Sequence, residues 1–315
     1  MEQNQNNSPE ICFGENTTDL THNQISIKSE LTDALELKVF FHSHYGFSSN
    51  STLICGNQDA ILVSAPFLLS DAHRLAAGIL ETGKNLTHIL IPEFHPDHHF
   101  AAGVLQDAFP DARVVATKNV AKDILYSADD KMELWGTLFG KQVPPRFYFP
   151  VPLMKDFLEI EGHKLEITDG WQADMANETV VWIPSIRAAL PTDLVFYQAH
   201  VWTVETNMEQ RKQWKANLEK LRTMSPQIVI PGHVHFNNFS SDPDTTISFT
   251  LQYLNDFDDI LAKVNTGDEL VARLEEKYPT KTTRFALHWQ ARFLFPDSCS
   301  DHIMPVPGIF HDPGE

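Results

Sequence analysis

One ten-residue segment constrains this chain more than any other, because it places metal-binding side chains directly after a buried-strand pattern. Residues 91–100, IPEFHPDHHF, contain three histidines, an aspartate and a glutamate, and the apolar run LTHIL precedes them. Alternate residues of an extended chain point to the same side, so Glu93, His95 and Asp97 are expected to converge. His98 would join them by turning inward as a helix begins. Four potential ligands would then meet at one strand end.

The same segment also has a simpler interpretation as a polar turn. Asp97 could cap the helix that HHFAAGVLQ predicts, and His98 or His99 could lie exposed in its first turn. If a metal binds instead, imidazole favours zinc, and carboxylate extends the choice to iron or manganese. The segment alone leaves both interpretations open.

The sequence around this segment alternates between strand and helix patterns. Short β-branched and aromatic runs between residues 35 and 67 predict strands. SDAHRLAAGILETGKN predicts a helix, because Ser70 or Asp71 can cap it, apolar residues recur at three to four positions, and Gly83 can end it. LTHILIPEF, HFAAGVLQDAF and ARVVAT continue the alternation. This order predicts a layered sheet with helical cover.

Strand patterns resume after about residue 160 in HKLEIT, ETVVWIP and TDLVFY, before a helical pattern and the apolar strand PQIVIPGHVH. Residues 127–156 are rich in aromatic residues and proline, which predicts a lid or pocket wall without regular structure. We therefore expect three parts: a disordered tail over residues 1–22, one α/β domain over residues 23–240, and a helical extension packed on it over residues 241–315.

Composition argues against several classes of function. The 24 basic and 42 acidic residues give a formal charge of −18, which opposes binding to nucleic acid or to an anionic membrane. Three widely separated cysteines predict neither a disulfide framework nor a zinc knuckle. No signal peptide and no apolar run of about 18 residues is visible. We expect a cytoplasmic protein that acts on a small molecule, and the C-terminal helices could form a homodimer contact.

Two distant segments also place potential ligands at strand ends. Asp193 starts an apolar strand in LPTDLVF, and His233 follows another strand in PQIVIPGHV. Strand ends can hold ligands rigidly. Each residue has an ordinary interpretation by itself, Asp193 as a turn residue and His233 as a loop histidine beside Gly232. Their occurrence together with the IPEFHPDHHF segment, in this order, favours a metal site.

With these segments the chain resembles the metallo-β-lactamase superfamily of binuclear metallohydrolases. The motifs EFHPDHHFAAG, LPTDLVF and IPGHV carry the resemblance, which covers about residues 37–240. It implies an αββα sandwich, in which two mixed β-sheets are flanked by helices and the metal ions lie at one edge. The alternation of strand and helix patterns agrees with this fold, to which the C-terminal helices would be an extension.

The residues at the implied metal site depart from the family pattern. Glu93 stands where the family has its first histidine, and Ser64 stands where an early turn usually carries an aspartate. The mid-chain histidine is also absent. Counting back from the proline that ends ETVVWIP leads to Asp174, with Asp169 as the alternative. His163 precedes the strand that should come before the ligand loop, so we interpret it as part of a surface turn.

The resemblance assigns a ligand set to two metal ions. One ion would bind Glu93, His95 and Asp174, the other would bind Asp97, His98 and His233, and Asp193 would bridge them. Four carboxylates and three imidazoles form a harder, more negative donor set than the histidine-rich family pattern. The four carboxylates would balance two divalent cations, which leaves less Lewis acidity for a bound water. We expect zinc first, with manganese or iron as alternatives.

The same resemblance implies hydrolysis. A hydroxide held between the metal ions would attack a carbonyl or similar electrophile, since coordination lowers the pKa of water from about 15.7 to near 7. Asp97 would orient the hydroxide, and the ions bridged by Asp193 would stabilise the oxyanion. His200, in FYQAHVW, is a further candidate catalytic residue. His42 and His44 are interpreted as solvent-facing or supporting histidines.

We therefore expect a metal-dependent hydrolase that acts on a small ester, lactone, thioester or amide. A di-iron oxidoreductase is a weaker alternative, because no flavin-binding partner domain is visible. In a third interpretation Glu93 and Asp174 weaken metal binding, and the degenerate protein serves as a binding or regulatory module. The expected pocket walls are Phe94, Trp135, Phe139, Trp171 and Trp202.

Overall fold

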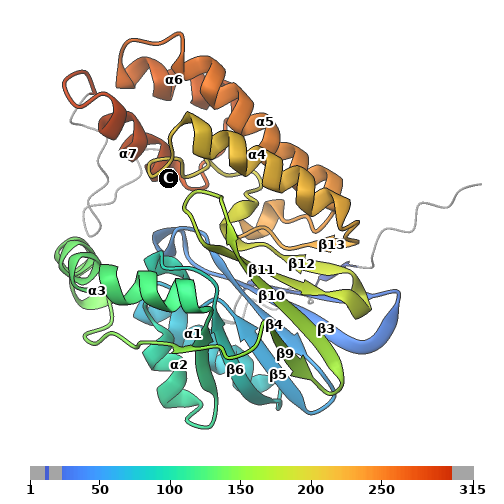
Figure 1. Cartoon of the computed structure of the whole chain (residues 1–315). Helices are drawn as coiled ribbons and strands as arrows, with labels where there is room; N and C mark the ends of the chain where they lie inside the picture. Colours follow the sequence, from blue (N-terminus) through green and yellow to red (C-terminus); the bar gives the residue numbers. More distant parts are fainter. Residues whose placement is uncertain (1–10, 14–22, 300–315) are drawn as a thin grey trace, which may run out of the picture.

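Two mixed β-sheets pack face to face between two helical layers in this computed structural model, which describes residues 11–13 and 23–299 (Figure 1). Strands β1 to β5 of the first sheet pair antiparallel, and β5 to β8 pair parallel. The strands of this sheet, in sequence and spatial order, are β1 (Ile11–Phe13), β2 (Gln24–Ser29), β3 (Thr32–Phe41), β4 (Asn50–Cys55), β5 (Asp59–Val63), β6 (Asn85–Ile91), β7 (Arg113–Ala116) and β8 (Val151–Pro152).

The second sheet has the spatial order β13, β12, β11, β10, β9. Its strands are β9 (Phe157–Ile160), β10 (His163–Trp171), β11 (Glu178–Ile183), β12 (Ala188–Leu190) and β13 (Ile228–Val229). Neighbours pair antiparallel except β12 and β13, which are parallel. His163 begins β10 at the turn of the β9–β10 hairpin, as expected for a residue in a surface turn.

The apolar core between the sheets follows from the two-residue period of the strands. In β3, Leu37 and Val39 are buried in the cluster between the sheets, where Leu165 and Ile167 of β10 meet them. Phe40, one position away, is buried instead in the cluster beneath the helices on the outer face. Along β3 the buried residues alternate with Glu36 and Lys38, which are half-buried, and both faces become apolar only at its end, at Val39 to Phe41.

Helices cover the outer face of each sheet (Figure 1). The helices over the first sheet are α1 (Leu69–Glu81), α2 (Ala102–Ala108) and α3 (Lys118–Phe139), and those over the second are α4 (Met208–Thr223), α5 (Pro243–Leu261), α6 (Gly267–Lys277) and α7 (Arg284–Leu294). Short 3₁₀ helices occur at η1 (His44–Gly46), η2 (Pro96–His98), η3 (Gly140–Gln142), η4 (Pro184–Ile186), η5 (Thr192–Leu194) and η6 (Phe236–Asn238). The αββα sandwich with a C-terminal helical extension is thus confirmed.

Two sequence-based predictions of local structure were wrong. TDLVFY was expected to be a strand that begins at Asp193, but Asp193 lies in the 3₁₀ helix η5 (Thr192–Leu194). Residues 127–139 were expected to form an irregular lid, but α3 continues through them to Phe139. Their aromatic side chains do not indicate a loop, because Trp135 and Phe139 belong to a packed aromatic cluster on the inner side of the helix. Of the predicted tail, residues 11–13 form β1 and pair with β2, and residues 1–10 and 14–22 lie outside the described residues, as do residues 300–315 of the predicted extension.

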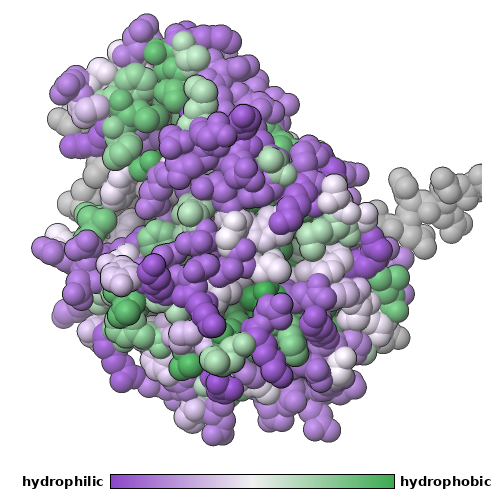
Figure 2. Space-filling view, viewed as in Figure 1, coloured by the Kyte–Doolittle hydropathy of each residue, from purple (hydrophilic) through white to green (hydrophobic). Residues whose placement is uncertain are grey.

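The helices of the described residues include no candidate membrane-spanning segment. None in the described ranges combines the length and the apolar character that crossing a bilayer requires. The face seen in Figure 2 is mostly hydrophilic, with hydrophobic side chains in small, separate groups.

Candidate metal centre

The segment after β6 turns its polar side chains toward the junction of the two sheets. β6 lies in the parallel part of the first sheet, between β5 and β7. Glu93 and His95 follow its carboxyl end, and the 3₁₀ helix η2 then presents Asp97 and His98. The carboxyl ends of parallel strands are the usual place for binding residues in such sheets.

The second half of the chain supplies three further side chains. Asp174 lies between β10 and β11, Asp193 lies in η5, and His233 follows β13. Gly232 is required beside His233, because a Cβ atom at this position would collide with the Asp193 carboxylate and the Thr192 backbone. The IPGHV motif is therefore explained by this close approach.

The first ligand group consists of Glu93, His95, Asp174 and Asp193. Each of them offers one ligand atom, and these atoms all lie within 4.8 Å of one another. His95 Nδ1 lies 2.9 Å from Glu93 Oε2 and 3.2 Å from Asp174 Oδ2. Glu93 and Asp174 are fully buried. Glu93 and Asp174, which stand where the resemblance implies histidines, thus lie in the same site as His95.

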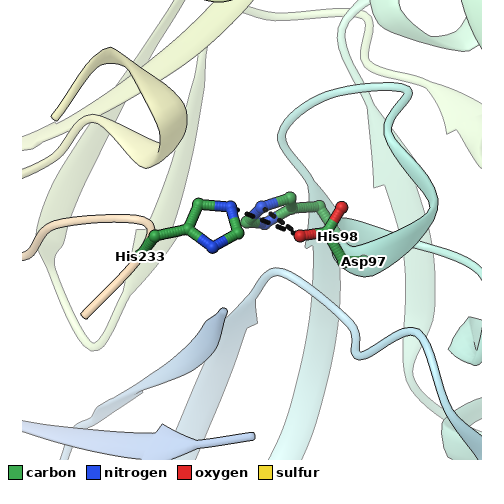
Figure 3. Close-up of side chains that lie close together, drawn as sticks. All are labelled: Asp97, His98 and His233. Atoms are coloured by element: carbon green, nitrogen blue, oxygen red, sulfur yellow. Dashed lines mark ion pairs between the residues drawn. The ribbon is translucent and has the colours of Figure 1, made fainter. Parts of the chain in front are cut away.

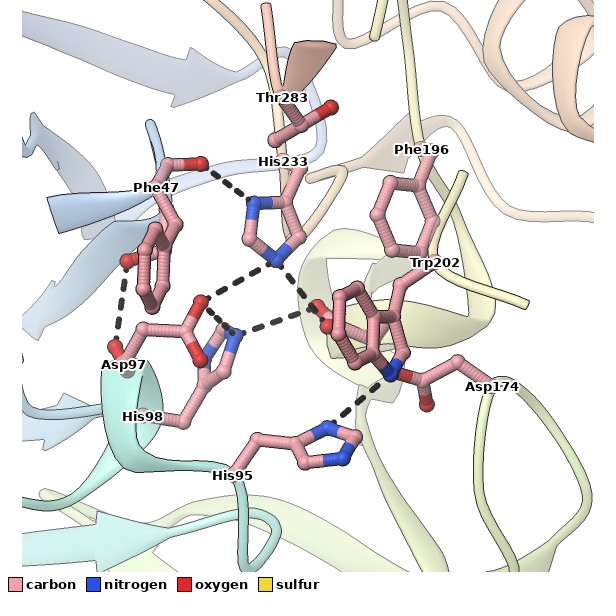
Figure 4. A network of polar contacts seen from close by, with 12 residues as sticks. Phe47, His95, Asp97, His98, Asp174, Phe196, Trp202, His233 and Thr283 are labelled. Carbon is pink, nitrogen blue, oxygen red and sulfur yellow. Dashed lines mark hydrogen bonds and ion pairs between the residues drawn. The ribbon is translucent and has the colours of Figure 1, made fainter. Parts of the chain in front are cut away.

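The second ligand group consists of Asp97, His98 and His233, whose ligand atoms also lie within 4.8 Å of one another (Figure 3). Asp97 Oδ2 lies 3.5 Å from His98 Nε2 and 3.3 Å from His233 Nε2. Figure 4 shows how Asp97, His98 and His233 lie within a network of polar contacts. Asp193 reaches this group as well, with Oδ1 at 3.2 Å from His98 Nε2 and Oδ2 at 3.1 Å from His233 Nε2. Asp193 therefore joins the two groups.

Several buried atoms of this site lack a hydrogen bond. Within the described part of the chain, both carboxylate oxygens of Glu93 and of Asp174, one of Asp193, and Nε2 of His98 have no hydrogen-bond partner. Their contacts have ion-pair distances without hydrogen-bond geometry. Buried charged groups without such partners are costly unless they are paired or coordinate a metal. Ligands at about 2.0–2.2 Å from a cation would lie this close together, so the residues fit metal ions.

Burial and the closeness of these side chains also shift their pKa values. Burial raises the pKa of Glu93 and holds that of Asp174 well above its ordinary value. Burial would lower the pKa of His98 and of His233, but the surrounding carboxylates raise them to about 10 and about 9. In the protein alone, protons therefore neutralise this cluster. A divalent cation would displace them, because metal ligands must be deprotonated.

Comparison with solved structures identifies the architecture. A metallo-β-lactamase family protein from Thermus thermophilus is 19% identical over 84% of this chain and 92% of that chain, with a TM-score of 0.59. A metallo-β-lactamase from Pontibacter korlensis is 16% identical over 74% of this chain and 99% of that chain, with a TM-score of 0.54. The chain has the metallo-β-lactamase fold. No family model and no curated protein matches its sequence.

In this metallo-β-lactamase fold, each histidine of the two groups is oriented by a partner outside the site. His98 Nδ1 lies 2.9 Å from Ser64 Oγ, and His233 Nδ1 donates to the carbonyl oxygen of Phe47 at 2.9 Å. His95 Nε2 donates to Glu205 Oε2 at 2.5 Å. Such partners fix the ring orientation and the tautomer of a metal-binding histidine.

Three charged residues near the site were missed by the sequence analysis. Glu205 accepts from His95 and also from the Trp202 indole at 3.2 Å. Glu178 is fully buried at the start of β11, and burial, reinforced by Glu93, holds its pKa well above the ordinary value. Lys131 of α3 lies over the Phe94 ring, 4.0 Å from its centroid. None of these residues belongs to a motif, so no signal in the sequence identified them.

Other predicted residues lie outside the two ligand groups. Asp169 is half-buried in β10, so of the two mid-chain candidates only Asp174 joins a group. His200 is buried, with Nδ1 at 3.1 Å from the Tyr253 hydroxyl and Nε2 at 3.2 Å from the Thr280 carbonyl oxygen. Its catalytic role stays a prediction. His42 is buried against Ser51 Oγ at 2.8 Å, and His44 is exposed in η1.

A cavity lies above the ligand groups; the centre of a water molecule can occupy about 50 Å³ of it, and all its empty space, with the open solvent at its mouth, amounts to about 410 Å³. Its lining includes the predicted wall residues Trp135 and Trp202 together with His95, Pro96, Asp97, Asp174, Asp193, His200, His233, Phe47, Phe196, Thr283, Phe285 and Ala286. The other three predicted wall residues do not line this cavity. Phe94 packs against the cluster beneath the helices of the first sheet. Phe139 packs in the aromatic cluster of α3, and Trp171 is buried under the helices of the second sheet.

Proposed function

We propose that this protein is a metal-dependent hydrolase that cleaves a small ester, lactone, thioester or amide. One observation carries the proposal: seven buried carboxylate and imidazole side chains converge below an open cavity, and several of their atoms have no hydrogen-bond partner among the described residues. The metallo-β-lactamase fold supports it, because solved structures of this fold include proteins named metallo-β-lactamases.

Two divalent ions are the cofactors that this site would hold, with zinc first and manganese or iron as alternatives. Glu93, His95 and Asp174 would hold one ion, the second ligand group would hold the other, and Asp193 would contact both. When bound, such ions lower the pKa of a coordinated water and polarise a carbonyl group.

Asp97 has the position of a group that orients the attacking water. It lines the cavity, and its Oδ2 lies at the centre of the second ligand group. We propose that the Asp97 carboxylate accepts a proton from that water. The water oxygen forms a bond to the acyl carbon, the bond from this carbon to the leaving oxygen, sulfur or nitrogen breaks, and the proton held by Asp97 passes to the leaving group.

Metal analysis combined with a hydrolysis screen tests this proposal. Protein purified without chelator, or reloaded with zinc, should contain about two metal equivalents per chain if both ligand groups are occupied. It should hydrolyse at least one compound from a screen of aryl esters, lactones, thioesters and β-lactams. Asp193→Asn should lose metal and reduce the activity on the order of 100-fold or more, because it removes the shared ligand.

Asp169→Asn is the matched control, since Asp169 is the mid-chain alternative that lies outside both groups. This variant should retain its metal and most of its activity. Protein that stays metal-free after incubation with zinc, manganese and iron would contradict the proposal and favour a degenerate binding protein. Undiminished hydrolysis by Asp193→Asn would contradict it equally.

A further inference from the structure

Aromatic side chains from four separate segments wall the cavity above the ligand groups. Phe47 follows η1, Trp135 belongs to α3, Trp202 lies in the loop before α4, and Phe285 belongs to α7. The Phe47 ring stacks on Phe285 at 4.5 Å between centroids and lies 5.4 Å from Trp135. Trp202 lies 6.3 Å from Phe285. The helical extension thus completes an apolar wall over the site.

The floor and the walls of this cavity differ in chemistry. Five ligand-type residues line the floor: His95, Asp97, Asp174, Asp193 and His233. If the scissile carbonyl group of a substrate lies at the floor, the acyl group attached to it would lie among the aromatic rings. Flat apolar groups pack favourably against such rings, both through burial and through ring stacking.

Among the described residues, no lysine or arginine lines the cavity, so no such side chain could pair with an anionic substrate. The nearby Lys131 already interacts with Glu205, Glu93 and Asp97. The four carboxylates of the ligand groups would balance two divalent ions, and the chain as a whole has a formal charge of −18. Long-range electrostatics therefore disfavour anions at this site.

We infer that the substrate is uncharged and carries a flat apolar group, such as a phenyl ring, on the acyl side of the scissile carbonyl. This inference rests on the proposed hydrolase function and narrows its substrate class. Hydrolysis adds water across the acyl bond, so a neutral ester would give an apolar carboxylic acid and an alcohol.

Three 4-nitrophenyl esters test this substrate class on the metal-loaded protein. The acetate has a small acyl group, the phenylacetate adds the phenyl ring, and the 4-carboxyphenylacetate adds a negative charge to that ring. After correction for spontaneous hydrolysis, kcat/KM for the phenylacetate should exceed both others on the order of 10-fold or more. Equal values for the acetate and the phenylacetate, or for the charged and the neutral ring, would overturn the inference.

Substitutions in the cavity wall test whether this wall causes the preference for the phenylacetate. Ala286 is buried and lines the cavity, so Ala286→Leu should fill the space for the phenyl ring. It should lower kcat/KM for the phenylacetate about 10-fold and change that for the acetate less than about 2-fold. Ala262→Leu makes the same change at an exposed position beyond α5 and should leave both values unchanged. Phe285→Ala, at a half-buried wall residue, should also weaken the preference and covers the case in which Ala286→Leu does not fold.

Calorimetric titration with phenylacetamide and acetamide separates the two proposals. If no ester is cleaved but phenylacetamide binds, acetamide does not, and Ala286→Leu removes the binding, the hydrolase proposal fails and the apolar pocket stands. If esters are cleaved without preference for the phenyl group and phenylacetamide does not bind, the hydrolase proposal stands and the substrate class is wrong.

Discussion

Each histidine of the two ligand groups uses its two ring nitrogens differently. His98 and His233 turn Nε2 toward the carboxylates and Nδ1 toward Ser64 and the Phe47 carbonyl, whereas His95 turns Nδ1 inward and Nε2 toward Glu205. A carboxylate that accepts from the outer nitrogen raises the basicity of the ring as a metal ligand. Glu205 is therefore the outer partner with the largest electrostatic effect.

Glu205→Gln should weaken metal binding roughly 10-fold or more, because the amide oxygen can still accept from His95 but lacks the charge. Competition with a chromophoric chelator measures the dissociation constant directly and does not depend on a substrate. Glu209→Gln is the matched control, since the side chain of Glu209 is 81% exposed on α4. Equal metal affinity in the two variants would show that Glu205 does not support His95.

At the scale of elements, the N-terminus of α4 holds the loop that carries Trp202 and Glu205. Asn207 caps this helix: its side chain accepts from the Gln210 amide at 3.0 Å, and the Gln210 side chain accepts from the Asn207 amide at 2.9 Å. This reciprocal capping box ends the loop and begins the helix at a defined residue. Trp202 of the cavity wall lies in this loop, so we expect its position to depend on the cap.

Asn207→Ala should lower the free energy of unfolding by about 1 kcal/mol, because an amide of the first turn loses its acceptor. Urea denaturation followed by circular dichroism gives this value. Asn255→Ala makes the same substitution at an exposed position within α5, where alanine is the better helix former, and should be neutral or slightly stabilising. A loss of stability of the same size in both variants would contradict the capping role.

For the whole molecule, the site forms only where the two halves of the sandwich and the extension meet. The first half contributes Glu93 to His98, and the second contributes Asp174, Asp193 and His233. His200 connects this region to the extension, since it accepts from the Tyr253 hydroxyl of α5 and donates to the Thr280 carbonyl oxygen before α7. Burial lowers the pKa of His200 to about 4.

This lowered pKa predicts a loss of stability in acid. Below pH 6.5, the ordinary pKa of histidine, His200 binds a proton in the unfolded chain but stays neutral in the folded protein. The free energy of unfolding therefore falls between about pH 6.5 and pH 4. Between pH 7.5 and pH 5 the wild type should lose roughly 2 kcal/mol more than His200→Gln, which keeps a donor and an acceptor but does not titrate.

Urea denaturation at the two pH values measures this difference. His73→Gln, at an exposed position of α1, is the control and should follow the pH dependence of the wild type. If His200→Gln loses as much stability in acid as the wild type, His200 does not carry this part of the pH dependence.

The local pattern of the sequence determined the fold and most of the ligand types. Two-residue and three-to-four-residue periods depend on neighbouring positions, and they predicted the alternation of strands and helices that the structure confirms. The ligands of IPEFHPDHHF converge for a local reason as well: they all follow the end of one strand, β6. The aromatic content of residues 127–139 misled the prediction, since burial of one helix face and an irregular wall require similar side chains.

Tertiary packing decided the rest. Glu205 meets His95 across 110 positions of the chain, and this contact exists only because the loop before α4 folds over the end of β6. Packing also placed Asp174 in the first ligand group and left Asp169 in β10. The local spacing of the sequence therefore predicted which residues are candidate ligands. The partners that orient these ligands, and the aromatic wall above them, come from distant segments that no local pattern connects.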